Sequence, residues 1–319
     1  MDDYKGKRVF VTGGGGFIAS HLCEHLVELG ANVTAFCHYN ALGRAGWLDY
    51  SPLRKQMNVV FGDVTDPGTI RPANGVGDIV FHLAALIGIP YSYQAAKSYI
   101  DTNVQGTYNV LEAAHLDGAE RVIVTSTSEV YGTMQYKMDE AHSIYPQSPY
   151  AASKVGGDAM ALAYHLSFGL PVIILRPFNT YGDKQSLRAV IPQIICQLLD
   201  CKRDGTNRLM LGNADAERDF IYVTDTVEGF VKAGIDSQVT AVGQAINLGS
   251  GACVSIAEVA TLAASIIGVD NVEIARIFGR LRPDNSEVDR LLSNNDKARV
   301  CLDWKPKVCL LEGLQRTIE

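Results

Sequence analysis

The fold is decided by residues 8–19, which read RVFVTGGGGFIA. Arg8–Thr12 is a short apolar run of the kind that forms a buried strand, and four glycines follow it directly. A helical pattern then places Leu22, Leu26 and Leu29 on one face. Strand, glycine turn and helix in this order predict the first βαβ unit of a parallel sheet.

The same turn predicts a dinucleotide site. Gly13 permits the tight turn, and Gly16 lets backbone N–H groups approach a pyrophosphate. The helix that begins at Phe17 and Ile18 adds the partial positive charge of its N-terminus. The alternative is a flexible glycine loop without a ligand, and the flanking strand and helix favour the dinucleotide.

Composition and charge exclude several classes of protein. The 319 residues are 47% hydrophobic and 20% charged, as in ordinary globular proteins. A net charge of -7 without a Lys/Arg run argues against a nucleic-acid or membrane partner, and no window approaches the ~18 apolar residues of a membrane span. The N-terminus lacks a signal-peptide pattern, and the seven cysteines form no C-x-x-C pair, so we expect free thiols in a cytoplasmic protein.

The second strand bears on cofactor choice. Folds that prefer NAD usually end this strand with an acid that binds the ribose 2′-hydroxyl. Here Asn32–Cys37 is followed by His38, and Arg44 lies a few residues further on. Because an acid is missing and cations are near, the sequence slightly favours NADP over NAD.

Further apolar runs alternate with helical patterns along the chain. We expect strands at Asn58–Gly62, Asp78–Leu83, Val122–Thr125, Val172–Arg176 and Ala245–Leu248, with one long helix over about 92–116 between two of them. This alternation predicts an α/β fold with a doubly wound parallel sheet. Asp63 and Val64, at the end of one strand, are expected at the adenine edge of the cofactor, and Ala84 and Ala85 at the end of the next allow close backbone approach.

The strand Val122–Thr125 runs into a polar segment that ends with Glu129-Val130-Tyr131-Gly132. Ligands sit at the carboxyl ends of parallel strands, so this segment is expected at the site. Tyr150 and Lys154, four residues apart on the next helix, share one face. An ammonium beside a phenol lowers the pKa of the phenol, which makes Tyr150 a candidate general base for an alcohol. A solvated helix face is the alternative for this pattern.

Two other patterns are weaker. The segment His21-Leu22-Cys23-Glu24-His25 fits the H-x-x-E-H pattern of some zinc proteases, but the helix is committed to phosphate and no third ligand can be named, so we expect no metal site. Arg218 and Arg282 are expected in loops, where they could bind phosphate or be solvated charges.

Together these motifs resemble the extended short-chain dehydrogenase/reductase family, and within it the nucleotide-sugar 4,6-dehydratases. The GDP-mannose dehydratases and the N-acetylglucosamine dehydratases of legionaminic acid synthesis are the most similar. The matching segments are Thr12–Ser20, Phe81–Ala85, Asp101–Asn103, Ser126–Gly132, Tyr150–Lys154, Arg176–Gly182, Arg218–Phe220 and Arg282-Pro283. The resemblance implies a Rossmann-type domain over 1–177 and about 220–247, and a smaller α/β substrate domain over 178–219 and 248–319. It also implies a homodimer built on helices near 92–117 and 150–168.

The resemblance assigns roles residue by residue. It implies that the catalytic residues are Thr127, Ser128, Glu129, Tyr150 and Lys154. It implies cofactor binding by Gly13, Gly16, Phe17, Ile18, His38, Arg44, Asp63, Val64, Leu83, Ala84, Ala85, Asn103, Ser126, Tyr150, Lys154 and Pro177. It implies binding of a UDP- or GDP-linked sugar by Ile87, Tyr93, Thr127, Asn179, Arg188, Val190, Arg218 and Arg282.

In the family's mechanism, a tyrosinate at Tyr150 oxidises the sugar at position 4 with the cofactor, Glu129 takes the proton at position 5, and hydride returns to position 6 as water leaves. Glucose-type dehydratases place Asp at Ser128, so the acid for the leaving water is unassigned here. UDP-glucuronate decarboxylases share the segment around Glu129 and form the second hypothesis. A 4-epimerase and a non-enzymatic NADP-binding sensor are the remaining alternatives.

Overall fold

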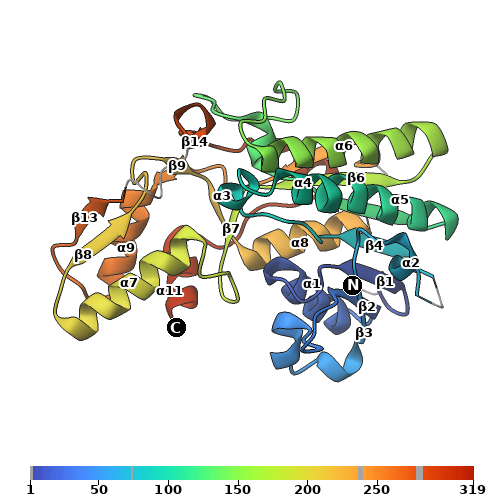
Figure 1. Cartoon of the computed structure of the whole chain (residues 1–319), viewed down its shortest axis with the longest axis horizontal. Helices are drawn as coiled ribbons and strands as arrows, with labels where there is room; N and C mark the ends of the chain where they lie inside the picture. The colour runs from blue at the N-terminus through green and yellow to red at the C-terminus, as the bar shows by residue number, and fades with distance from the viewer. Residues whose placement is uncertain (1–2, 73–74, 236–239, 278–282) are drawn as a thin grey trace.

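The computed structural model of the chain describes residues 3–72, 75–235, 240–277 and 283–319. Its centre is a seven-stranded sheet in which all neighbours are parallel, in the order β11-β6-β5-β4-β1-β2-β3 (Figure 1). The strands are β1 (Arg8–Thr12), β2 (Asn32–His38), β3 (Asn58–Gly62), β4 (Ile79–His82), β5 (Arg121–Thr125), β6 (Val172–Pro177) and β11 (Ala245–Leu248). The expected doubly wound sheet is confirmed.

Helices cover both faces of this sheet, as Figure 1 shows. On one face lie α1 (Phe17–Glu28) and α8 (Val223–Gly234), and on the other lie α2 (Pro67–Ile70), α5 (Gly106–Leu116) and α6 (Pro149–Phe168). Alternate residues of the strands enter two separate cores: Ile123 of β5 packs on the α8 side, and its neighbours Val122 and Val124 pack on the α6 side. This period of two in side-chain direction explains why the buried strands read as continuous apolar runs.

A smaller lobe lies at the left of Figure 1 and is built from the second half of the chain. Its helices are α7 (Val190–Asp204), α9 (Ile256–Ile267) and α11 (Leu310–Ile318), and α10 (Asp296–Leu302) packs near α8. The short sheets pair β7 (Asn179–Tyr181) with β10 (Phe220–Tyr222), β8 (Arg208–Leu211) with β13 (Glu273–Arg276), and β9 (Glu217–Arg218) with β12 (Val254–Ser255) and β14 (Arg290–Leu291). The domain boundaries drawn from the sequence stay a prediction.

The single long helix expected over about 92–116 is wrong in detail. A short α3 (Ile89–Ser92) is followed by a break, and the helix proper begins with α4 (Ala96–Tyr99). It then widens into a π-helical turn, Ile100–Gln105, before α5. Periodicity could not reveal this turn because one added residue shifts the apolar pattern by less than a third of a helical turn. Across the described residues, no helix combines the length and apolar character needed to cross a membrane.

Candidate active site

The glycine turn has the geometry that a dinucleotide requires. Gly13 has a φ of +72°, and a Cβ at this position would lie 2.9 Å from the backbone of Ala84 beyond β4. Gly16 precedes α1 without a side-chain cap, so no side chain occupies the amide groups of the first helical turn at Phe17 and Ile18. A close backbone approach and an uncapped helix N-terminus together fit a pyrophosphate.

The predicted adenosine end lies at the tips of β2 and β3. His38 ends β2 with an exposed side chain whose Nδ1 lies 3.7 Å from the Asp63 carboxylate. Arg44 is also exposed, 3.9 Å from Asp49. Asp63 accepts hydrogen bonds from the amide and hydroxyl of Thr65, which hold it at the strand end. Val64, next to Asp63 in the chain, is buried.

The other predicted cofactor residues line the same edge of the sheet. They follow β4 (Leu83, Ala84, Ala85), follow β5 (Ser126), end β6 (Pro177), or stand on the π-helical turn against this edge (Asn103). The Ser126 hydroxyl donates to Asp158, and the Asn103 side chain bonds the backbone of Leu86. The parallel topology therefore gathers residues from distant parts of the chain at one edge.

The predicted catalytic residues come together at the start of α6. Thr127 caps the short 3-10 helix η4 (Ser128–Tyr131) by accepting from the Glu129 amide, which turns Glu129 inward. Tyr150 lies in the first turn of α6 and hydrogen-bonds with the Thr127 side chain. The negative charge of Glu129 acts to raise the pKa of Tyr150. Lys154 lies one turn further on, and all four side chains are buried. Ser128 is buried beside them.

Burial dominates the acid-base properties of this cluster. It raises the pKa of the Tyr150 phenol well above its usual value, and the Thr127 hydrogen bond opposes this rise. Burial lowers the pKa of Lys154 to about 8, while the Asp158 carboxylate acts to raise it. The expected lowering of the Tyr150 pKa by Lys154 is therefore wrong for this structure, because burial is the largest influence on this pKa and the charge of Glu129 raises it further.

A buried polar network behind the cluster was missed by the sequence reasoning. Asp158, four residues beyond Lys154, accepts from Ser126 and from the Arg176 guanidinium, 3.0 Å away. Arg176 also donates to the Tyr131 hydroxyl, which donates to Asn247 of β11. The signal was present: Asp158 shares the helix face of Lys154, and Arg176 lies within a buried strand, where a charge requires a partner.

The position of Arg218 differs from the one expected from the sequence. It was expected in a loop, but it lies in strand β9, 5% exposed, where its guanidinium donates to the carbonyl oxygens of Glu217 and Asp289. The Glu287 carboxylate is 3.5 Å away. A two-residue strand is too short to leave a hydrophobic period, so sequence could not distinguish it from a loop.

The other predicted substrate residues differ in exposure. Asn179 begins β7, and its Oδ1 atom is buried with no hydrogen-bond donor among the described residues. The Tyr93 hydroxyl bonds Ser286, whose own hydroxyl proton goes to the Gln147 carbonyl, so Tyr93 is the donor. The rest lie around the start of α7 or on the loop after β4: Ile87 and Arg188 are exposed, and Val190 is the first residue of α7. Arg282 lies outside the described residues.

The H-x-x-E-H segment on α1 is occupied by other contacts. His21 lies 3.2 Å from the Asp183 carbonyl oxygen, and Glu24 pairs with Lys184 at 2.7 Å. His25 lies 3.3 Å from Glu28. Within the described ranges, no three His, Cys, Asp or Glu side chains gather as metal ligands would.

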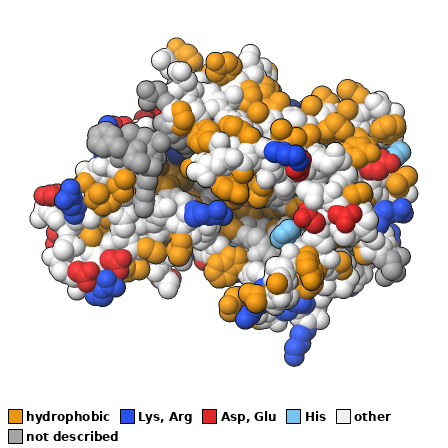
Figure 2. Space-filling view, in the orientation of Figure 1, with side chains coloured by type: hydrophobic (Ala, Val, Ile, Leu, Met, Phe, Trp, Pro, Cys, Tyr) orange, Lys and Arg blue, Asp and Glu red, His pale blue; other side chains and the backbone are white. Residues whose placement is uncertain are grey.

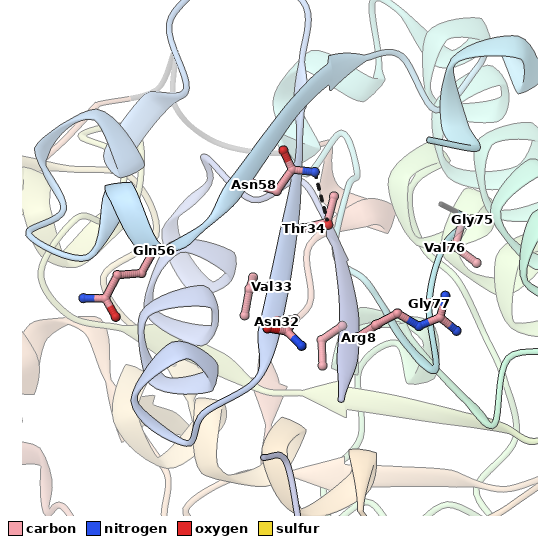
Figure 3. Close-up of a pocket in the computed structure, with 10 residues that line it drawn as sticks. Arg8, Asn32, Val33, Thr34, Gln56, Asn58, Gly75, Val76 and Gly77 are labelled. Atoms are coloured by element: carbon pink, nitrogen blue, oxygen red, sulfur yellow. Dashed lines mark hydrogen bonds between the residues drawn. The ribbon is translucent and has the colours of Figure 1, made fainter. Parts of the chain in front are cut away.

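A hollow of about 370 Å³ lies at the opposite edge of the sheet, at the amino ends of β1, β2 and β3 (Figure 3). Its polar lining residues include Arg8, Asn32, Thr34, Gln56 and Asn58. None of the predicted site residues lines it.

Comparison with known proteins places the chain in a family. The family model described as GDP-mannose 4,6 dehydratase matches residues 10–317. A UDP-N-acetyl-alpha-D-glucosaminuronate decarboxylase of Bacillus cytotoxicus is 32% identical, over 98% of this chain and 97% of its own length. A UDP-glucose 4-epimerase of Mycolicibacterium smegmatis is 31% identical, over 98% and 97%.

Among solved structures, the chain is similar to DesIV, a dTDP-glucose 4,6-dehydratase of Streptomyces venezuelae solved with NAD and TYD. The TM-score is 0.86 and the identity 29%, over 98% of this chain and 95% of DesIV. Solved neighbours hold NAD or NADPH, and several hold nucleotide sugars.

Proposed function

We propose that this chain, which belongs to the GDP-mannose 4,6-dehydratase family of extended short-chain dehydrogenases/reductases, is a 4,6-dehydratase. Its relatives act on nucleotide sugars as dehydratases, epimerases or decarboxylases. The sugar is oxidised at position 4, loses water across positions 5 and 6, and then takes up hydride at position 6 and a solvent proton at position 5. The substrate is UDP- or GDP-linked. When bound, NADP or NAD supplies the acceptor and donor of that hydride.

The position of Glu129 is the observation that carries this proposal. Glu129 is 8% exposed, and its charge acts on the Tyr150 phenol. Burying a carboxylate costs free energy, so its presence there favours a chemical use. A dehydratase needs a base for the carbon-bound proton at position 5, in addition to the base for the 4-hydroxyl, and Glu129 can supply it.

The neighbouring side chains divide the remaining work. Tyr150 takes the proton of the 4-hydroxyl, and Thr127 holds the same oxygen. Because burial raises the pKa of Tyr150, the phenolate needs a positive charge nearby, and Lys154 is the ammonium on its own helix face. Ser128 lacks the acidity to protonate the leaving water, so we assign that proton to Glu129 after it has received the proton from position 5.

The phosphates of the substrate are assigned to arginines beyond the catalytic cluster. Arg188 precedes α7 with an exposed side chain, and Arg218 of β9 is buried with Glu287. Planar guanidinium groups suit a diphosphate. Asn179 offers a buried Oδ1 atom that can accept a hydrogen bond from the substrate.

Product mass tests the proposal. The protein is incubated, with NADP and with NAD, against UDP-N-acetylglucosamine, GDP-N-acetylglucosamine, GDP-mannose and UDP-glucuronate. Loss of one water, with one solvent deuterium at position 5 in D₂O, supports the dehydratase and names the substrate. Loss of carbon dioxide from the glucuronate would make it a decarboxylase, like the Bacillus relative, and an isomer of unchanged mass would make it an epimerase.

We also propose a homodimer that pairs α5 and α6 with the same helices of a second copy. Leu116 of α5 and Leu162, Leu166 and Phe168 of α6 are between 41% and 74% exposed. Figure 2 shows hydrophobic side chains gathered over these helices, at the upper right. A patch of this kind on a folded protein marks an association surface. Light scattering on the purified protein measures the mass, and a monomer that persists at high concentration would contradict the dimer.

A further inference from the structure

His82, the last residue of β4, has a hydrogen bond on each ring nitrogen. These bonds connect the carboxyl ends of the strands, where the cofactor is expected, with helix α6. On one side, the Thr12 hydroxyl lies 2.8 Å from Nδ1. The same hydroxyl oxygen accepts from the Leu83 and Ala84 amides, each at 3.1 Å. A hydroxyl has two acceptor positions and one proton, so Thr12 must donate its proton to His82. Nδ1 is therefore unprotonated.

On the other side, the Thr107 hydroxyl lies 3.0 Å from Nε2 of His82. The Thr107 hydroxyl donates its own proton to the Asn103 carbonyl oxygen, 2.6 Å away. Its remaining role toward His82 is that of acceptor, so Nε2 must carry the hydrogen. The two hydroxyls leave one arrangement, a neutral imidazole protonated at Nε2.

The chain of bonds continues to the catalytic helix through Asn103 in the π-helical turn. The Asn103 side chain accepts from the Leu86 amide and donates to the Leu86 carbonyl oxygen, both at 2.9 Å. It also donates to the Ser153 hydroxyl, which donates to the Tyr150 carbonyl oxygen. Asn103 thus connects the segment after β4 with the first turn of α6. A π-helical turn often marks a functional position, and here it carries the connecting residue.

The segment after β4 is also the wall against which the glycine turn packs. A Cβ on Gly13 would lie 2.9 Å from the Ala84 Cα and amide nitrogen. The Thr12 hydroxyl orients the Leu83 and Ala84 amides in this wall. A shift of a few tenths of an ångström there changes the space for the cofactor, because no side chain of the glycine turn can compensate.

We propose that His82 is a positioning residue. As a neutral imidazole, it fixes the segment after β4, against which the cofactor would lie, relative to the first turn of α6. His82 touches no substrate in this role and acts through Thr12, Thr107 and Asn103. Its surroundings keep it neutral: the residue is 2% exposed, and burial, with the Lys154 charge nearby, lowers the pKa of His82 to about 3. The catalytic part of this inference rests on the proposed function, whereas the tautomer and the cofactor binding do not.

The tautomer is measured on the unaltered protein. ¹⁵N spectra of histidine-labelled protein, with the His82 signal identified by its loss in His82→Gln, should show a neutral Nε2–H ring at every pH from 5 to 9. A ring that titrates near pH 6.5, or one protonated at Nδ1, overturns the bond chain whatever reaction the protein catalyses.

The positioning role is measured with a matched pair. Thr107→Val keeps the shape but removes the hydroxyl, and Thr107→Ser keeps the hydroxyl. We expect Thr107→Val to weaken NAD(P)H binding, followed by cofactor fluorescence, about ten-fold and to lower kcat about ten-fold. Thr107→Ser should stay within about two-fold of the unaltered protein. Equal cofactor affinities and equal kcat values for the two variants would overturn the positioning role. A lower melting temperature of Thr107→Val with unchanged cofactor affinity would also overturn it, because His82 would then serve stability alone.

Discussion

The two edges of the central sheet make opposite use of polar residues. At the carboxyl ends, His82, Lys154, Asp158 and Arg176 are buried, and the last two bond each other. At the amino ends, the polar residues that line the hollow of Figure 3 are exposed, except for the half-buried Thr34, to which Asn58 donates over 3.5 Å. Burying polar groups costs free energy, so the edge that bears this cost is the functional one, and a hollow alone does not identify a site.

The largest effect is expected from Glu129→Gln. The variant keeps the shape and removes the base for the proton at position 5, so the dehydration rate should fall about 10³-fold. The exchange of hydride between the sugar and the cofactor should persist, since it needs Tyr150. Stopped-flow absorbance of the reduced nicotinamide and product mass separate the two steps.

Glu140→Gln is the matched control. Glu140 lies between η4 and α6, and its carboxylate accepts from the Asn247 backbone amide, which a glutamine oxygen can also do. We expect activity within about three-fold of the unaltered protein, since one neutral hydrogen bond replaces one to a charge. Equal losses in Glu129→Gln and Glu140→Gln would remove the distinction on which the dehydratase assignment depends.

The next effect is a pH dependence. Because the pKa of Lys154 is lowered to about 8, kcat should fall as the pH rises through 8 and the ammonium is lost. Asp158→Asn removes a carboxylate that raises this pKa, so the fall should move to lower pH. Ser126→Ala removes a hydrogen bond to Asp158 but leaves its charge, and the fall should stay near pH 8.

The free energy of unfolding should depend on pH in the opposite direction to kcat: the contribution of Lys154 to it should rise as the pH rises. The folded-state pKa of Lys154 lies below the ordinary value of 10.5, so between about 8 and 10.5 the unfolded chain binds more protons than the folded one. The contribution of Lys154 to the free energy of unfolding therefore rises with pH in this window. Urea unfolding of the unaltered protein and Lys154→Met at pH 8 and pH 10 measures the difference.

A smaller effect is expected at the tip of β2. If the cofactor is NADP, which the sequence slightly favours, Arg44→Ala should weaken NADPH binding about ten-fold and leave NADH binding unchanged, because the lost ion pair involves only the 2′-phosphate. His38→Ala should act in the same direction. Tighter binding of NADH than of NADPH by the unaltered protein would contradict the preference.

The smallest effect is expected at the amino-end hollow. Asn58→Ala should change the free energy of unfolding by less than about 0.5 kcal/mol and kcat by less than about two-fold, since the side chain is exposed. Denaturant unfolding and steady-state kinetics measure both. A loss comparable with that of Thr107→Val would mean that the hollow has a function.

The strands were predictable because each buried strand leaves an apolar run, and those at Arg8–Thr12 and Asn58–Gly62 agree with the structure to the residue. The glycine turn before α1 and the placement of Tyr150 and Lys154 on one helix could be predicted from their spacing, whereas their chemical roles stay a prediction. Burial was harder: Arg218 was expected in a loop, and Asp158 and His82 were not singled out. Partners such as Arg176 for Asp158, or Thr107 for His82, lie 18 and 25 residues away, and no local pattern pairs them.

The order of the central sheet bears on how this protein can be recombined with its relatives. Strand β11 pairs with β6 at the edge of the sheet, although β7, α7 and β8 of the smaller lobe lie between them in the chain. Asn247 of β11 accepts from the Tyr131 hydroxyl, next to the proposed catalytic helix. A chimera that takes everything after β6 from another parent therefore replaces a strand of the catalytic sheet. Substrate preference should be exchanged as two inserts, one before α8 and one after β11, so that β11 and Tyr131 keep the same parent.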